Sequence, residues 1–328
     1  MSLRSRFVLI FIAAIVVGGP LVAQAPQPGA PPAAAAPAAP AQQGGTPADR
    51  AAAAAAAMKA PFVPFHIIGN IYYVGSTGIA CYVITTPAGD VLLDTGYADM
   101  APQIEQNIKT LGFKLSDIKI LINSHAHTDH GGGLAELKSA TGAQLVAMAQ
   151  DVPYLESGGH NDVLFHDQNL FPPVKVDRVI HDGDTVTLGG VTLKAYLTAG
   201  HTPGTTTWTT TTEEKGKSYN VVFLGSVVAV PTNKLFDKPD SPATYPGIKS
   251  DFDHAFAVVK ALPCDVFLAS NGAFFDMQKK HDALRNGADP NPFIDPAGYQ
   301  AYVARSEANY QKIVQSQQGT DAPTSHTP

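Results

Sequence analysis

A cluster of histidines directly after a short apolar run constrains this chain more than any other feature. Residues 118–123 read Ile-Lys-Ile-Leu-Ile-Asn, which is typical of a strand, and residues 125–130 read His-Ala-His-Thr-Asp-His. A strand that ends in such a cluster delivers polar side chains to a sheet edge, where functional loops commonly lie. His125 and His127 are two residues apart and can face the same side of an extended loop. We interpret the segment as a metal site, because neutral imidazole is the commonest metal ligand in proteins.

The cluster has further donors nearby and a partner far along the chain. Asp129 and His130 can turn toward a second ion, and we expect the glycines at 131–133 to permit the tight backbone turn needed there. His201 follows the strand-like run 191–197 and is bracketed by Gly and Pro. Three imidazoles around one zinc would leave the fourth position open to water, as in catalytic rather than structural sites. The alternative, a solvated histidine-rich loop, fits the spacing poorly.

The hydrophobic pattern predicts two similar halves, each with strand runs followed by helices. This order indicates two sheets packed face to face with helices outside. The expected strands are 71–74, 79–85, 91–94, 118–123, 178–181, 185–188, 191–197, 206–211, 220–224 and 266–269, and the expected helices are 100–111, 134–140, 251–262, 276–286 and 297–315.

The N-terminus has the features of an export signal, predicted over residues 1–25. Two arginines precede an apolar run over 7–17, and Ala23-Gln24-Ala25 has the small-x-small form of a cleavage site. Pro26 would follow the cut, a position that signal peptidases disfavour, so cleavage and retention as an N-terminal membrane anchor both stay open. Apart from such an anchor, the sequence predicts no membrane span. The expected location is periplasmic or secreted.

Composition divides the rest of the chain. Residues 26–60 are nearly all Ala, Pro, Gly and Gln, so we predict a disordered linker, in which the alanines at 51–57 could form a marginal helix. The folded domain should cover 61–318, and 319–328 should be a disordered tail. The net charge of −6 argues against a nucleic-acid partner. Cys81 and Cys264 lie in apolar runs, and two buried thiols are favoured over one disulfide.

The motifs together resemble the metallo-β-lactamase superfamily and, within it, class B β-lactamases of the third subclass. The resemblance covers about residues 65 to 315. Besides the histidine cluster, the sequence segments that carry it are Leu92-Leu93-Asp94-Thr95-Gly96, Gly158-Gly159 with Asp162, Phe171-Pro172-Pro173-Val174, Asp182-Gly183-Asp184 and Ala199-Gly200-His201-Thr202-Pro203-Gly204-Thr205-Thr206-Thr207-Trp208. The resemblance implies an α+β fold, the αββα sandwich of two mixed sheets.

The resemblance also implies a mechanism and a substrate class. His125, His127 and His201 match the ligands of a first zinc, and Asp129 and His130 match two ligands of a second. The implied activity is opening of the β-lactam ring of penicillins, cephalosporins and carbapenems by metal-bound hydroxide, which Asp129 would orient. A small-molecule β-lactam is therefore the expected partner.

Two positions refine this expectation. Ser226 follows Phe223-Leu224-Gly225, where many hydrolases of the superfamily have a metal-bridging Asp. Third-subclass lactamases have Ser there, where it helps to hold the substrate carboxylate. Asn271 stands where the second zinc has its third ligand, a His. Because an amide oxygen is a poorer zinc ligand than imidazole, we expect Zn²⁺ to occupy one firm site and one weakened site.

Several alternatives stay open at this point. The departure at Asn271 leaves room for an exported hydrolase of another kind, such as a lactonase, or for a catalytically silent zinc-binding protein. Asp94 is expected to be a structural residue behind the site rather than a ligand. His160 and His166 lie in a loop that is expected to border the site; solvated histidines are favoured there, and contact with substrate is the alternative. His254 and His281 are expected to be surface residues on helices.

Overall fold

A mixed seven-stranded sheet forms the first half of the protein, whose computed structural model describes residues 46–318. Its strands run in the spatial order of the chain: β1 (Phe65–Ile68), β2 (Ile71–Tyr73), β3 (Tyr82–Ile84), β4 (Asp90–Leu93), β5 (Ile118–Ile122), β6 (Gln144–Met148) and β7 (Arg178–Ile180). Neighbours from β1 to β4 are antiparallel, and those from β4 to β7 are parallel.

A mixed five-stranded sheet forms the second half, in the spatial order β12-β11-β10-β9-β8. The strands are β8 (Thr185–Leu188), β9 (Val191–Leu197), β10 (Thr206–Glu214), β11 (Lys217–Leu224) and β12 (Val266–Ala269). β8 to β11 form antiparallel pairs, whereas β11 and β12 are parallel, so both of these strands deliver the residues that follow them to the same edge.

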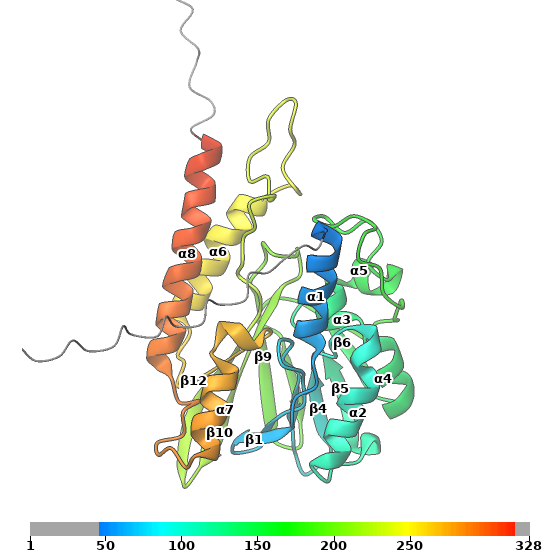
Figure 1. Ribbon diagram of the computed structural model, residues 1–328, viewed down its shortest axis with the longest axis vertical. Helices are drawn as coiled ribbons and strands as arrows, with labels where there is room; N and C mark the ends of the chain where they lie inside the picture. Colours follow the sequence, from blue (N-terminus) through cyan, green and yellow to red (C-terminus); the bar gives the residue numbers. More distant parts are fainter. Residues whose placement is uncertain (1–45, 319–328) are drawn as a thin grey trace, which may run out of the picture. The chain divides into compact units, whose positions relative to one another are not determined.

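Helices cover the outer faces of both sheets, as Figure 1 shows. Buried side chains of α2 (Ala101–Thr110), α4 (Leu134–Thr141) and α5 (Val152–Ser157) pack in one apolar cluster on the first sheet. A larger cluster joins the facing sides of the two sheets to α6 (Ile248–Ala261), α7 (Met277–Arg285) and α8 (Pro296–Gln318). The predicted αββα sandwich is confirmed.

The element prediction also holds in detail, with exceptions. Each predicted helix is present with its ends within three residues, and β12 spans the predicted residues. β1, β6 and α5 were not predicted. The expected strand 79–85 is shortened to Tyr82–Ile84, because the Ala80 amide donates to the Ser270 carbonyl and the Ile79 carbonyl accepts from the Ser76 amide in a turn.

The expected linker over 26–60 differs from the structure in its last part. Helix α1 spans Pro47–Lys59, and its end is tied to the first sheet by the amide of Gly78, which donates to the Met58 carbonyl at 3.0 Å. The amide of Thr77 donates in the same way to the Ala60 carbonyl at 2.9 Å. These long-range bonds stabilise a helix that would be marginal alone. The predicted signal segment 1–25, residues 26–45 of the linker and the tail 319–328 lie outside the described residues.

The surface position predicted for His281 is wrong. Its side chain is buried, and its ring lies 4.9 Å from that of Phe62 and 4.5 Å from that of Phe65, between centroids. The segment that leads into β1 covers this face of α7. His254 is exposed as predicted, and so are His160 and His166.

The two cysteines are free thiols, as predicted, with Cys81 buried and Cys264 partly buried. Among residues 46–318, no helix combines the length and the hydropathy that a membrane span requires.

Candidate metal centre

The histidine cluster begins where β5 ends, and β5 lies between β4 and β6 inside the first sheet. His125 and His127 lie on the loop after the strand, and Asp129 and His130 lie on the one-turn helix α3 (Thr128–Gly131). The first two residues are therefore on a loop as expected, whereas the next two are helical. Their side chains can turn to a different side from those on the loop.

The glycines after the cluster act by close packing and not through a left-handed turn. Gly132 has φ −59 and Gly133 has φ −83, which any residue can adopt. A Cβ at Gly132 would lie 2.7 Å from the amide nitrogen of Ala98, and one at Gly133 would lie 2.5 Å from the Thr95 carbonyl. The helix turn approaches the backbone after β4 too closely for any side chain, so the expected reason for these glycines is wrong.

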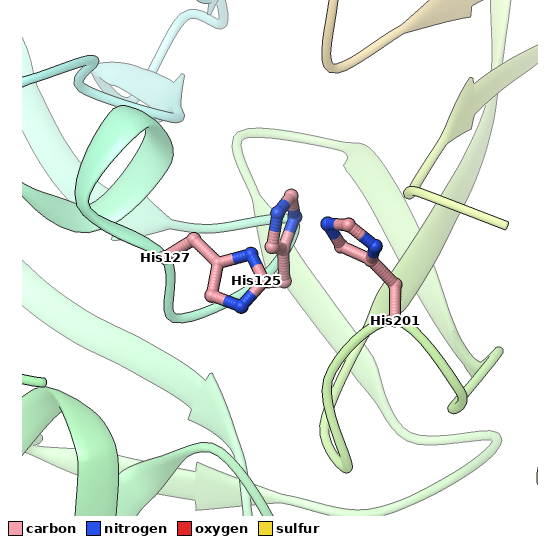
Figure 2. Close-up of side chains that lie close together, drawn as sticks. All are labelled: His125, His127 and His201. Carbon is pink, nitrogen blue, oxygen red and sulfur yellow. The ribbon is translucent and has the colours of Figure 1, made fainter. Parts of the chain in front are cut away.

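His201 lies opposite the cluster, on the loop that joins β9 to β10 in the other sheet. One ligand atom from each of His125, His127 and His201 lies within 4.8 Å of the others. Figure 2 shows the three rings facing one another from two separate loops. The sandwich thus brings His201 beside two histidines that lie 74 and 76 residues earlier in the chain.

Hydrogen bonds to the far nitrogens orient two of these rings. The Ser124 hydroxyl lies 3.0 Å from Nδ1 of His125, and the Val228 carbonyl accepts from Nδ1 of His201 at 3.0 Å. Each contact leaves Nε2 free to face the centre of the group. This arrangement, in which the second nitrogen of a ligand has its own partner, is typical of zinc-binding histidines. The donor set therefore fits zinc.

Electrostatics keep two of the rings neutral. Burial, and after it the neighbouring His127, lower the pKa of His201 to about 3. Burial also lowers the pKa of His125, together with the nearby His130 and His201. Because metal ligands must be deprotonated, these two rings are ready to bind a cation at neutral pH.

A second group, His125, Asp129 and His130, shares one histidine with the first. Oδ2 of Asp129 lies 3.2 Å from Nε2 of His130. Burial would lower the pKa of His130, but Asp129 and Asp94 outweigh it and raise the pKa to about 10. In return, His130 holds the pKa of Asp129 below its usual value, although burial opposes this. Asp129 and His130 thus form an ion pair within the second group.

Asp94 supports the 125–130 cluster from behind, as predicted, through Ser124 and His130. Its carboxylate accepts hydrogen bonds from the Ser124 amide at 2.6 Å and the Ser124 hydroxyl at 2.7 Å. Its Oδ2 also lies 3.1 Å from Nδ1 of His130. Since these contacts use both oxygens, Asp94 orients ligands rather than binding the metal itself.

Asp151 ties the two ligand loops together, a role that the sequence analysis missed. Its buried carboxylate accepts hydrogen bonds from the Ala126 amide at 2.8 Å, the Thr202 hydroxyl at 3.1 Å and the Gly204 amide at 2.8 Å. Burial raises its pKa to about 6, against the effect of these donors. One side chain therefore holds the residue between His125 and His127 beside the loop of His201.

Ser226 and Asn271 follow the parallel strands β11 and β12 at the same sheet edge. Ser226 is buried, and the carbonyl two residues later orients His201. Asn271 Oδ1 accepts a hydrogen bond from the Ser270 hydroxyl at 3.2 Å. The strand arrangement is compatible with both expected roles, substrate binding and a weak second-site ligand, and these roles stay predictions.

Comparison with known protein families supplies the deciding observation. The model of the metallo-β-lactamase superfamily matches residues 74–270. The chain belongs to the metallo-β-lactamase superfamily. The matched residues include both groups of metal ligands, so the resemblance inferred from the histidine cluster is confirmed.

Within the superfamily, the chain is similar in structure to enzymes of subclass B3. The FEZ-1 metallo-β-lactamase from Legionella gormanii is 40% identical with a TM-score of 0.76, and the match covers 79% of this chain and 98% of that one. BJP-1 of Bradyrhizobium japonicum, a subclass B3 metallo-β-lactamase, is 42% identical with a TM-score of 0.74, over 80% of this chain and 98% of that one.

Curated relatives point to other hydrolases, over shorter stretches. A probable metallo-hydrolase of Burkholderia pseudomallei is 28% identical over 138 residues, 40% of this chain. A hydroxyacylglutathione hydrolase of Erythrobacter litoralis is 28% identical over 168 residues, 51% of this chain. The chain spans 44% of the length of the first relative and 53% of that of the second. These matches support a metallo-hydrolase without fixing its substrate.

Proposed function

We propose that this metallo-hydrolase opens the β-lactam ring of antibiotics. The observation that carries the proposal is the similarity to two metallo-β-lactamases at 40% identity or more over nearly their whole length. The converging rings of His125, His127 and His201 supply the metal site that such a reaction needs. Bound zinc would supply a Lewis acid for the amide carbonyl and would lower the pKa of water.

The protein's own residues would position the reactants. Asp129 belongs to the second group, which shares His125 with the first group. Its carboxylate therefore lies close to the ligands of both groups. Because its pKa is lowered, it is ionised at neutral pH and can accept a hydrogen bond from an attacking water. In this proposal the ionised Asp129 orients the attacking water by accepting a hydrogen bond from it.

Ser226 is proposed to hold the carboxylate of the substrate. It lies beside the segment that orients His201, and a hydroxyl at this place can donate to an anion without binding a metal itself. An Asp at this position would instead offer a ligand for both ions, as in other hydrolases of the superfamily. Ser226 therefore favours an amide substrate that carries its own carboxylate.

The first group is proposed to bind zinc firmly and the second group more weakly. Three imidazoles suit zinc well, whereas Asp129 and His130 would share their ion with the amide of Asn271. One similar structure, LRA-12, is described as a di-zinc enzyme. In this chain we expect the second ion to bind at higher zinc concentration.

A second candidate function is hydrolysis of another acyl substrate, either a hydroxyacylglutathione thioester or a lactone. The curated relatives that are hydroxyacylglutathione hydrolases favour the thioester, and Asn271 departs from the lactamase pattern. A third possibility, a zinc-binding protein without catalysis, follows from the same departure.

The test compares five substrate classes at saturating zinc: a penicillin, a cephalosporin, a carbapenem, hydroxyacylglutathione thioesters and lactones. His201→Ala serves as the control that removes a ligand of the first group. The proposal expects β-lactam turnover that disappears in the control. Turnover of thioesters or lactones alone would favour the second candidate, and tight zinc binding without any hydrolysis would favour the third.

We also propose that the protein is exported to the periplasm or secreted. The proposal rests on the charged start, the apolar run over 7–17 and the small-x-small site at 23–25. N-terminal sequencing of the mature protein from cell fractions tests it. A mature N-terminus near residue 26 is expected, whereas an intact start in the cytoplasmic fraction would contradict export.

A further inference from the structure

The loop between Gly158 and Phe171 lies against the metal centre at a single turn. Its neck is closed by the Phe171 amide, which donates to the Gly158 carbonyl at 3.0 Å. Most of the loop is exposed, including His160 and residues 166–170, whereas Asp162 is 6% exposed. The buried turn is therefore the part of the loop that can respond to the metal centre.

Asp162 uses its two carboxylate oxygens in two directions. Oδ1 accepts hydrogen bonds from the amides of Leu164 at 2.8 Å and Phe165 at 2.6 Å, which close the turn. Oδ2 lies 3.4 Å from Nε2 of His127, a ligand of the first group. One side chain thus belongs both to the fold of the loop and to the surroundings of a metal ligand.

Phe165 adds a second contact from the same turn to the same histidine. Its ring lies 5.0 Å from the His127 ring, between centroids, in an edge-to-face arrangement. The residues at either side of the turn, Asn161 and His166, have positive φ values of 59 and 52. A backbone held in this uncommon conformation needs contacts that fix it, and those to His127 contribute.

We propose that Asp162 is a positioning residue that couples metal loading to the seating of this loop. A metal bound at Nδ1 of His127 leaves the ring proton on Nε2, which faces the Asp162 carboxylate. The 3.4 Å contact then becomes a charge-assisted hydrogen bond that fixes the ring and the turn together. Loading the first group would therefore order the turn of the loop that lies beside it.

The coupling is reciprocal. If zinc stabilises the seated loop by a given factor, the seated loop tightens zinc binding by the same factor. Loss of such a partner of a ligand typically lowers metal affinity about 10- to 100-fold. The inference rests on zinc binding by the first group and is independent of which bond the enzyme breaks.

The test uses Asp162→Asn in the full chain, with Asp167→Asn as the matched control. The side-chain amide introduced by Asp162→Asn would keep an oxygen for the two amides of the turn but would present an N–H group to the N–H of His127. Asp167 lies in the same loop, where its Oδ1 accepts from the Asn161 amide at 2.9 Å, and it is exposed. Its replacement perturbs the loop without facing a ligand of the first group.

Two measurements decide the proposal: zinc affinity by competition with a chelating dye, and hydrogen exchange of the Leu164 and Phe165 amides with and without zinc. We expect zinc to slow exchange of these amides in the wild type and in Asp167→Asn. In Asp162→Asn, zinc affinity should fall about 10- to 100-fold and the slowing should be lost.

Equal zinc affinity in the wild type, Asp162→Asn and Asp167→Asn, together with exchange that zinc does not change, would overturn the proposal. The first group would then still bind zinc, so the proposed function would stand. A wild-type protein that binds no zinc would overturn both.

Discussion

Asp151→Asn is expected to loosen the metal centre without touching any ligand. The wild-type carboxylate accepts two amide hydrogen bonds at 2.8 Å and one hydroxyl bond at 3.1 Å. An amide has one acceptor oxygen, so in the variant an N–H group must face the amide of Ala126 or that of Gly204. One loop is then no longer held to the other.

The size of the effect follows from the burial of this side chain, which is 1% exposed. Loss of a hydrogen bond to a buried charged group, with a donor left unpaired, costs about 2–3 kcal/mol. For a domain of this size, that loss corresponds to a fall of roughly 4–12 °C in Tm. Zinc affinity of the first group should fall about 10- to 100-fold, because His201 is no longer fixed beside His125 and His127.

Thermal unfolding and zinc competition, measured on the same preparations, check this prediction. Asp177→Asn is the matched control, because Asp177 also accepts a backbone hydrogen bond, from the Leu145 amide at 2.8 Å. That bond lies near the start of β6, whereas the ligands follow the end of the parallel strand β5. The control should keep wild-type zinc affinity. If Asp151→Asn and Asp177→Asn bind zinc equally well, the role assigned to Asp151 is wrong.

Three further predictions concern the surroundings of the metal. Because the pKa of His130 is about 10, a metal that binds the second group must displace one proton, and its affinity there should rise about tenfold per pH unit up to that pKa. Calorimetry in two buffers of different ionisation enthalpy should detect the released proton. Binding heats that do not depend on the buffer would contradict this prediction. Trp208→Phe removes the donor to the Asn123 carbonyl at 3.0 Å and should lower the free energy of unfolding by about 1–3 kcal/mol. Unfolding is followed by circular dichroism, because the variant loses the one Trp of the chain and with it the Trp fluorescence signal. Gly132→Ala should lower the free energy of unfolding by about 1–3 kcal/mol, because its new Cβ meets backbone atoms. Gly131→Ala should lower it less, because the nearest atom that its Cβ meets is a Leu155 methyl group at 3.2 Å. Equal losses of unfolding free energy in chemical denaturation would refute the packing argument.

The metal centre was largely predictable because its ligands stand in short segments with distinctive spacing. The apolar run before the cluster and the Gly and Pro around His201 place both at strand ends, and the family resemblance then paired them. Asp151 was not predictable in this way. It is a single carboxylate outside these segments, and its role depends on how two loops from different sheets meet.

The predictions for the segment of α1 and for His281 were wrong for the same reason, because contacts between remote segments decide both. An alanine-rich helix with little apolar patterning carries no local sign of a partner, yet α1 is tied to the turn at Thr77 and Gly78. His281 looks like a surface residue on an amphipathic helix, and Phe62 and Phe65 bury it from a distant part of the chain. Contacts between remote segments decide such positions, whereas periodicity along the chain decides the strands and helices themselves.

We propose that this protein is a zinc hydrolase with a firm first site and a weakened second site. Its most direct test is Asn271→His, with zinc content and β-lactam turnover measured together as zinc is added. We predict that the wild type binds one equivalent tightly and a second weakly, and that the variant binds the second more tightly. An unchanged zinc content in the variant would contradict the role given to Asn271, and no zinc-dependent turnover in either protein would contradict the hydrolase itself.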